Sequence, residues 1–270
     1  MKIEQVRECQ LWQLEALKFI DKVCRDNGLK YFAHAGTLLG AARHGGYIPW
    51  DMDTDIVMPR EDCIKLVNAV NKIGNPNYKA KFTGQGMGYS ERLVVYTVKC
   101  FGEAVIDQDD EFVHIDIYSY DNATTLGGIR RMLYGYKSQF LNRLISYRNG
   151  VTAVANPIHK LMLAIAKVFY MCRTDEQIRN SILKRAICDT DSENITIFNS
   201  FYGFGKETYS KSVFEETVFL KFEDIEIPAP RDYEIVLTNL YGDWTKLPPV
   251  DKRYPDYLER LNYEVLGKRV

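Results

Sequence analysis

Residues 50–58 read Trp50-Asp51-Met52-Asp53-Thr54-Asp55-Ile56-Val57-Met58, and no other run in the chain is as informative. Alternate side chains of a strand share one face, so Asp51, Asp53 and Asp55 are expected to point the same way, with neighbouring Cα atoms roughly 6 to 7 Å apart. Carboxylates at this spacing repel one another and raise one another's pKa. A divalent cation offsets that cost, and Mg²⁺ bound by carboxylates and substrate phosphates suits the pattern.

Three interpretations of this run compete. An EF-hand loop needs Gly at its sixth position and a bidentate Glu at its twelfth, where this chain has Ile56 and Asp62. A solvated acidic strand end is the ordinary structural alternative. The third interpretation, a catalytic Asp-x-Asp pair, requires a further carboxylate from another strand.

A strand predicted over Phe112–Tyr118 supplies such a carboxylate. Its odd-numbered positions 113 to 117 are apolar, which leaves His114 and Asp116 on the opposite face. An Asp between two Ile residues is either paired with a buried Arg, or used to cap a turn, or functional. We expect Asp116 to converge with Asp53 and Asp55, where two metals roughly 3.5–4 Å apart would activate a hydroxyl and neutralise a leaving phosphate.

Phosphate-binding candidates precede the acidic run. Gly36 follows a short predicted strand and allows close backbone approach to a phosphate, while Thr37 can hydrogen-bond that phosphate beside the positive end of a helix. An N-cap explains Thr37 equally well. Arg43, followed by His44, suits a bidentate phosphate clamp or is an ordinary surface arginine.

The order of predicted elements indicates an α/β or α+β fold with a mixed sheet flanked by helices. Hydrophobic periodicity and stop signals predict helices over Ile3–Asp26, Gly36–Arg43, Arg60–Ile73, Ile129–Tyr147, Ile158–Cys172, Asp175–Ile187 and Arg231–Leu240. Extended segments are predicted over Tyr31–His34, Tyr47–Met58, Tyr78–Phe82, Leu93–Cys100, Phe112–Tyr118 and Val213–Ile227, the last as a hairpin around Glu223-Asp224. We therefore expect a catalytic core over residues 1–125, a helical annex over 126–200, and a C-terminal hairpin and helix over 201–270 that pack back on the core.

Composition excludes several classes of protein. The 35 Lys and Arg nearly balance the 36 Asp and Glu, which gives no general attraction to nucleic acid. The six cysteines form no C-x-x-C pair and the first residues contain no apolar h-region, so we expect reduced thiols, no signal peptide and a cytoplasmic protein.

The segment Val151–Cys172 leans apolar but contains His159, Lys160 and Lys167, so it is too short and too charged to span a bilayer. It predicts a buried helix or a helix lying on the inner membrane surface. Helices within Val151–Ile187 are expected to form the acceptor side of a cleft. Its basic residues Lys160, Lys167 and Arg173 either meet an anionic glycan or a membrane surface, or are ordinary solvated charges.

Several motifs together resemble the LicD-type phosphocholine transferase family, which is related to the fukutin-type proteins and belongs to the nucleotidyltransferase superfamily. The similarity covers most of the chain, with residues 126–198 the least recognisable. It is carried by Ala35–His44, Gly46–Asp55, His114–Tyr118, Phe222-Glu223, Ile227–Pro230, Tyr233, Leu240–Trp244 and Leu247–Pro249.

The resemblance implies a nucleotidyltransferase-type fold in which Asp53, Asp55 and Asp116 bind Mg²⁺ (or Mn²⁺) and carry catalysis. Gly36 and Thr37 stand where the superfamily holds the donor phosphates. The full set of expected substrate-binding residues is Gly36, Thr37, Arg43, His44, Asp51, Lys99 and His114. Met52 stands where the familiar form of the run has Asp, on the side expected to face away from the metals.

The implied reaction moves phosphocholine, or a similar substituent, from CDP-choline or another CDP-linked donor to a sugar hydroxyl. The acceptor would be a cell-surface glycan, a teichoic-acid precursor or another lipid-linked glycan. A nucleotidylyltransferase that releases pyrophosphate from a nucleoside triphosphate is the alternative enzyme. A non-catalytic glycan-binding member of the family is the alternative from a different class.

Overall fold

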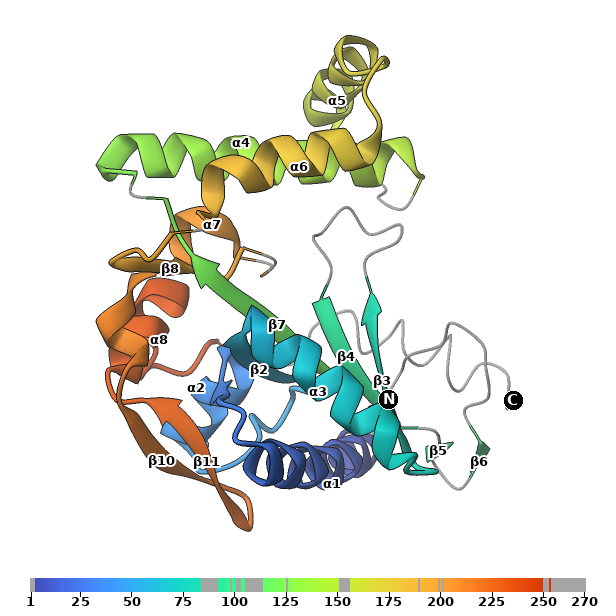
Figure 1. The fold of residues 1–270 in the computed structure, drawn as a ribbon, viewed down its shortest axis with the longest axis vertical. Helices are drawn as coiled ribbons and strands as arrows, with labels where there is room; N and C mark the ends of the chain where they lie inside the picture. Colours follow the sequence, from blue (N-terminus) through green and yellow to red (C-terminus); the bar gives the residue numbers. More distant parts are fainter. Residues whose placement is uncertain are drawn as a thin grey trace. The chain divides into compact units, whose positions relative to one another are not determined.

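The computed structural model describes residues 3–83, 92–97, 99–100, 103–104, 114–124, 126–150, 156–188, 190–198, 200, 202–249 and 253. The chain forms two compact units (Figure 1). The first unit contains Met1–Lys81, Leu93–Ile117 and Glu216–Val270, and the second contains Phe82–Arg92 and Tyr118–Glu215. Each unit is described by itself.

The main sheet of the first unit pairs its strands in the order β1-β2-β7-β4-β3. β1 and β2 are antiparallel with Ala33 opposite Ile56, and β4 and β7 are antiparallel with Val94 opposite Asp116. The first five residues of β2 are buried, so both faces of this strand are covered. The bounds are β1 (Phe32–Ala33), β2 (Thr54–Pro59), β3 (Tyr78–Thr83), β4 (Arg92–Thr97) and β7 (His114–Asn122).

Helices α1 (Ile3–Asn27), α2 (Ala35–His44), α3 (Arg60–Ile73) and α8 (Tyr233–Tyr241) belong to the same unit. α1 buries apolar residues at helical spacing, among them Val6, Leu17 and Ile20, and packs against α3. α2 contacts β2, α8 and β10 (Thr217–Phe222), which forms a hairpin with β11 (Ile225–Pro230). A separate two-stranded ribbon joins β5 (Lys99–Cys100) to β6 (Glu103–Ala104).

The second unit is mainly helical. It contains α4 (Gly128–Arg148), α5 (Pro157–Phe169), α6 (Asp175–Ala186), the short helices α7 (Gly203–Lys206) and η1 (Lys211–Phe214), and strands β8 (Asn194–Thr196) and β9 (Thr208–Ser210). Leu144, Leu163, Ile178 and Phe204 are buried in its core. A Cβ atom on Gly135 would lie 2.9 Å from the backbone nitrogen of Gly205, so glycine permits α4 and α7 to pack backbone to backbone. None of the helices in the described residues is long and apolar enough to cross a membrane.

The expected α/β class, with a sheet flanked by helices, is confirmed. The helix Arg60–Ile73 and the hairpin around Glu223-Asp224 are confirmed as well. The expected strand Leu93–Cys100 is divided between β4 and β5, which pair with different partners. β8, α7, β9 and η1 were not expected, and Phe112 and Val113 lie outside the described residues.

The expected extended segment Tyr47–Met58 is wrong in its first half. β2 begins only at Thr54, because the Asp51 N–H donates to the carbonyl of Ile48 (2.9 Å) and closes a turn. The three acidic residues therefore do not share one strand face: Asp53 is exposed, Asp51 is half-buried and Asp55 is buried.

The burial of α1 gives a direct test of this packing. Leu17 is fully buried, whereas Leu11 on the same helix is 46% exposed. Leu17→Ala should lower the free energy of unfolding by about 2–5 kcal/mol, because it removes core contacts and leaves a cavity. Leu11→Ala should change it by no more than about 0.5 kcal/mol. Urea denaturation measures both, and equal losses would contradict the placement of α1.

Candidate active site

A sharp turn from β1 into α2 forms one wall of the candidate site. Ala35 has a positive φ of 42°, which L-residues rarely adopt, and the next residue is Gly36. A Cβ atom on Gly36 would lie 2.6 Å from Oδ2 of Asp51 and 3.8 Å from Oδ2 of Asp55. Only glycine lets the start of α2 come this close to two carboxylates.

Thr37 and Gly36 fasten the start of β2 to the start of α2. The Asp55 N–H donates to Oγ1 of the buried Thr37 (2.8 Å), and the backbone of Gly36 donates to the Asp55 carboxylate. The N-cap of α2 is His34 and not Thr37, so the capping interpretation of Thr37 is wrong. Thr37 instead positions the acidic strand.

The carboxylates of the acidic run interact electrostatically with one another and with Asp116 of β7. Burial raises the pKa of Asp55 well above its usual range, and the negative charges of Asp53, Asp116 and Asp51 raise it further, in that order of strength. Asp116 reaches this group because β7 lies next to β2 in the sheet. On the same strand, Nε2 of His114 lies 3.3 Å from Oδ1 of Asp116.

The chemistry of these donors fits a hard divalent cation. The cluster offers carboxylate oxygens, which Mg²⁺ prefers. Burial is the main cause of the raised pKa of Asp55, and the neighbouring negative charges that raise it further are what a cation would offset. Asp53, Asp55 and Asp116 are the residues that would hold it. Among the described residues no group of three or more His, Cys, Asp or Glu already has the spacing of a metal shell. Binding would therefore require these side chains to draw closer.

The other expected substrate-binding residues divide into two groups. Arg43 donates to the carbonyls of Trp244 (3.0 Å) and Lys246 (3.2 Å) and so ties α2 to the segment after α8. It also donates to Nε2 of His44, whose pKa is lowered by burial and by the Arg43 charge. Lys99 lies in β5, opposite Ala104 and away from the pairings of the main sheet.

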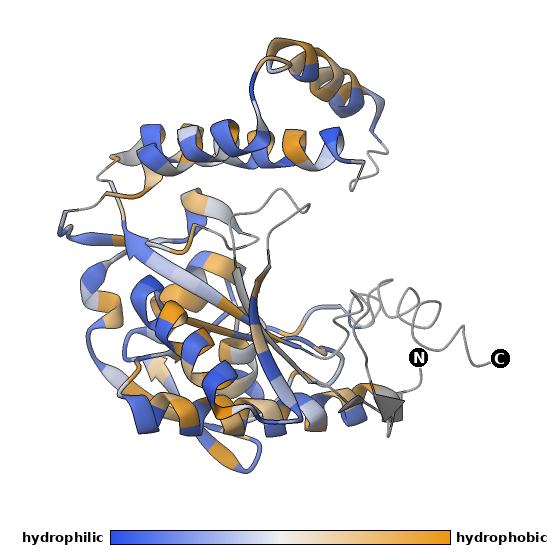
Figure 2. Cartoon of the chain, turned by 45° about the vertical axis from the view of Figure 1, so that its right-hand side comes forward, coloured by the Kyte–Doolittle hydropathy of each residue, from blue (hydrophilic) through white to orange (hydrophobic). Residues whose placement is uncertain are grey.

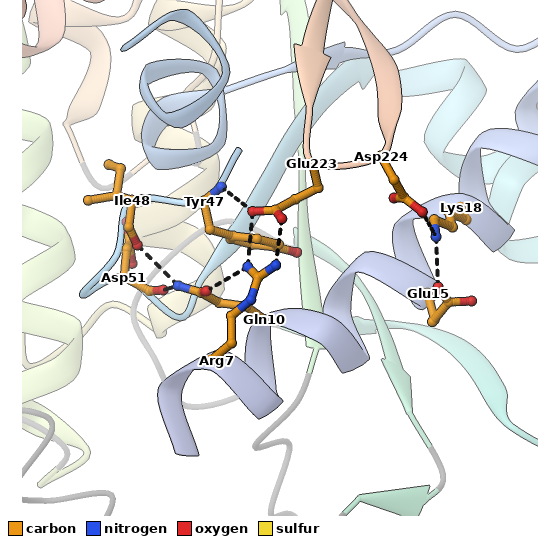
Figure 3. Close-up of polar contacts among 9 residues, drawn as sticks. All are labelled: Arg7, Gln10, Glu15, Lys18, Tyr47, Ile48, Asp51, Glu223 and Asp224. Atoms are coloured by element: carbon orange, nitrogen blue, oxygen red, sulfur yellow. Dashed lines mark hydrogen bonds and ion pairs between the residues drawn. The ribbon is translucent and has the colours of Figure 1, made fainter. Parts of the chain in front are cut away.

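A polar network that the sequence did not indicate holds the loop of residues 45–51, which leads into β2 (Figure 3). Glu223, at the tip of the β10–β11 hairpin, accepts two hydrogen bonds from Arg7 (3.0 and 2.6 Å) and one from the Tyr47 N–H (2.9 Å). The Gln10 amide donates to the carbonyls of Ile48 (3.1 Å) and Asp51 (2.7 Å). The loop is thus held from α1 on one side and from the hairpin on the other.

A close approach of Glu223 to Gly46 and the hydrogen bonds of Gln13 also hold the loop in place. Glu223 has a positive φ of 58°, and a Cβ atom on Gly46 would lie 2.5 Å from its Oε1. The buried Gln13 donates to the Met52 carbonyl and accepts from the Thr54 hydroxyl. In the sequence, Gln10 and Gln13 look like ordinary polar residues of an amphipathic helix, so no sequence pattern marked them as part of the site. The sequence did mark Phe222-Glu223, because this pair is one of the motifs that carry the family resemblance.

Comparison with known proteins adds to this geometry. A family model described as LicD/FKTN/FKRP, nucleotidyltransferase domain, matches residues 28–143. The chain is 24% identical over 261 residues to Lipopolysaccharide cholinephosphotransferase LicD of Haemophilus influenzae, covering 96% of this chain and 98% of that protein. It is 44% identical over 48 residues to the human Ribitol 5-phosphate transferase FKRP, covering 18% of this chain and 10% of that protein.

A solved structure, ANT(2″)-Ia in complex with adenylyl-2″-tobramycin, aligns with 64% of this chain and 98% of its own at 14% identity. The TM-score is 0.27, which is too low to bear on the fold.

Adjacent hairpin residues test the network. Glu223→Ala should lower the free energy of unfolding by about 1–2 kcal/mol, because it removes the carboxylate that accepts hydrogen bonds from Arg7 and from the Tyr47 N–H. Amide hydrogen exchange at Tyr47 should accelerate. Asp224→Ala is the matched control: Asp224 pairs with Lys18 at the surface, so its loss should have a smaller effect on stability and none on Tyr47. Similar exchange in both variants would show that the hairpin does not hold the loop.

The raised pKa of Asp55 predicts how the metal-free protein responds to pH. Because the folded-state pKa lies above the unfolded-state value, this residue favours folding most below that unfolded value. Its contribution falls as pH rises through the folded pKa. Asp55→Asn should therefore raise the melting temperature in EDTA at neutral pH, by about 2–4 °C for each kcal/mol of repulsion removed.

The comparison must be made between wild type and variant at each pH, because Glu223 titrates in the opposite sense. Its hydrogen bonds from Arg7 lower its pKa, so its stabilising effect is lost as pH falls. The difference between the two melting curves isolates Asp55. A variant that melts lower than wild type at neutral pH without metal would mean that the Asp55 charge stabilises the fold.

Proposed function

We propose that the chain transfers phosphocholine, or a similar phospho-substituent, to a glycan, because residues 28–143 match the LicD/FKTN/FKRP nucleotidyltransferase-domain family. The donor is a CDP-linked compound such as CDP-choline. The acceptor is a sugar hydroxyl of a cell-surface glycan or a lipid-linked glycan precursor. The near full-length similarity to LicD favours choline over ribitol as the substituent, since the match to FKRP covers only 18% of this chain.

One observation carries the proposal: four carboxylates interact beside a helix start whose glycine approaches them closely. Asp51 and Asp55 face Gly36, and Asp53 and Asp116 act on Asp55. A helix start attracts phosphate through its free N–H groups and its dipole. The carboxylates repel phosphate unless a cation lies between them. A site with both features suits a substrate that brings its phosphates together with Mg²⁺.

Each residue then has a role in the transfer. Asp53, Asp55 and Asp116 would hold the Mg²⁺, which supplies charge neutralisation for the departing phosphate. Gly36 gives the donor phosphates access to the start of α2, and Thr37 keeps Asp55 in place. The sugar hydroxyl oxygen forms a bond to the phosphorus that carries choline, and the bond from that phosphorus to CMP breaks. Asp116 accepts the hydroxyl proton, and His114, 3.3 Å away, orients that carboxylate.

The two alternatives make different products. A nucleotidylyltransferase attacks the α-phosphate of a nucleoside triphosphate and releases pyrophosphate. A glycan-binding protein without activity releases neither and does not respond to metal. The buried, crowded Asp55 favours an enzyme, because a binding surface gains nothing from a carboxylate with a raised pKa.

The experiment is a donor screen with the purified chain. CDP-choline, CDP-ribitol, CDP-glycerol and nucleoside triphosphates are each incubated with Mg²⁺ or Mn²⁺, with and without a glycan acceptor, and CMP and pyrophosphate are quantified. We expect CMP from CDP-choline, and none after addition of EDTA. Pyrophosphate from a triphosphate would replace this function with the alternative enzyme.

Within the same assay, Asp53→Asn should reduce CMP release by about 100-fold or more, because it removes one negative metal ligand. Asp53 is exposed, so the melting temperature of this variant should stay near that of wild type. Asp26→Asn is the control, since Asp26 is an exposed carboxylate that pairs with Lys22 on α1. Unchanged CMP release by Asp53→Asn would remove this residue from the site.

A further inference from the structure

Positive charge is concentrated in one segment of the chain. Between Asn122 and Thr174 the sequence contains no Asp or Glu, but it contains eight basic residues: Arg130, Arg131, Lys137, Arg143, Arg148, Lys160, Lys167 and Arg173. The remainder of the chain holds the other 27 of the 35 Lys and Arg and all 36 Asp and Glu, a formal charge of −9. The near-neutral total therefore hides a strongly basic segment, which forms α4 and α5 of the second unit.

α5 exposes an unusual amount of apolar surface. Leu161 is 63% exposed, Ile165 50% and Phe169 83%, and these residues recur every four positions along the helix. Ile158, Met162 and Val168 are also exposed and fall on the same side by helical spacing. The residues that α5 buries against the core of its unit, Leu163 and Ala166, lie on a different side. A contiguous exposed apolar face of this kind marks a surface that another phase or molecule covers.

The polar residues of α5 complete an amphipathic helix. Lys160 and Lys167 are exposed and lie seven positions apart, on the side away from the exposed apolar residues. Arg173 follows the helix and is exposed as well. Hydrophobic and hydrophilic residues are both visible along α5 in Figure 2. A helix with bulky apolar residues on one face and lysines on the other is typical of segments that lie in the plane of a membrane interface.

We propose that α5 docks on an anionic lipid bilayer. Its exposed apolar side chains enter the boundary between headgroups and acyl chains, and Lys160, Lys167 and Arg173 bind headgroup phosphates. The helix lies on the membrane and does not cross it, because its 13 residues span about 20 Å against roughly 30 Å of hydrocarbon. The acidic remainder of the chain is not attracted to an anionic surface, so the electrostatic attraction comes from the basic segment that contains α5.

Three other occupants suit this face less well. A second copy of the chain would place eight basic residues against eight more with no acidic residue of the segment to pair them. A nucleic acid would meet the positive charge, but it offers little to aliphatic side chains such as Leu161 and Ile165. An acidic protein would have to cover the apolar face as well, and anionic lipid supplies both chemistries in one surface.

A cavity in the second unit also favours lipid as the partner of α5. It has a volume of about 570 Å³ and is lined by polar residues, including Asn142, Arg143 and His159, and by apolar ones such as Met162 and Phe198. His159 and Met162 belong to α5, so the cavity adjoins the proposed docking face. Arg143 and His159 give it the donors that a headgroup phosphate needs.

The test is co-sedimentation of the full chain with vesicles, in the absence of donor and metal. Vesicles of phosphatidylcholine alone are compared with vesicles that also contain phosphatidylglycerol. We expect binding to the anionic vesicles only, weakened at about 0.5 M NaCl because salt screens the attraction. This result does not depend on any transferase activity, so it stands or fails separately from the proposed function.

Two variants with matched controls identify the face. Leu161→Ser/Ile165→Ser/Phe169→Ser should reduce binding about tenfold or more. Lys160→Gln/Lys167→Gln/Arg173→Gln should reduce it by about fivefold for each charge removed. The controls are Ile64→Ser/Ile73→Ser/Phe219→Ser and Lys22→Gln/Lys65→Gln/Lys246→Gln, which change exposed residues of the first unit and should bind as wild type does.

Circular dichroism and melting temperature check that each variant is folded, and CMP release from the donor should be unchanged by the α5 variants. Equal binding to neutral and anionic vesicles, or equal loss in the control variants, would overturn the proposal. A wild-type dimer in light scattering that the apolar α5 variant converts to a monomer would overturn it too, by showing that a second copy covers the face.

Discussion

A buried carboxylate surrounded by other carboxylates is unfavourable in water without a counter-ion, and Asp55 is held in such a position from several directions. The backbone of Gly36 donates to its side chain, Thr37 fixes its own N–H, and its carbonyl accepts from the N–H of His34. These contacts join β1, α2 and β2 at one point. Protein structures often retain a strongly shifted carboxylate of this kind at functional sites, and the proposed function gives this one the role of a metal ligand.

The loop that precedes Asp55 depends on residues far away in the chain. Gln10 of α1 and Glu223 of the hairpin hydrogen-bond to the backbone of residues 45–51, and Arg7 of α1 holds the Glu223 side chain. Glu223 also donates its own N–H to the carbonyl of Gly45 (2.9 Å). Asp51 and Asp53 both precede the first residue of β2, so strand alternation does not set their positions, and the long-range contacts of the loop do. Rigid support of this kind is what a site for a charged substrate requires.

The sequence predicted what local patterns determine. The helix Arg60–Ile73 has clear periodicity and a terminal Gly74, and the Glu223-Asp224 turn separates two alternating runs. Asp116 stood out in the sequence because it lies between two apolar residues of an alternating strand. In the structure it is close enough for its charge to raise the pKa of Asp55. The turn at residues 48–51 could not be predicted, since it rests on Gln10 and on the long-range Arg7–Glu223 pair. The three-residue strands β8 and β9 are too short to show a period.

Net charge describes the chain only as a sum and does not show how the charges are distributed. The formal charge of −1 predicts no general attraction to nucleic acid, but it is composed of a segment of +8 and a remainder of −9. The two charges suit different partners. The acidic side chains around Asp55 repel a phosphate unless a cation lies between them, whereas the basic residues of the segment with α5 attract phosphate groups directly. An enzyme whose acceptor is attached to a lipid benefits from both, because the membrane then concentrates the enzyme where its substrate is already held.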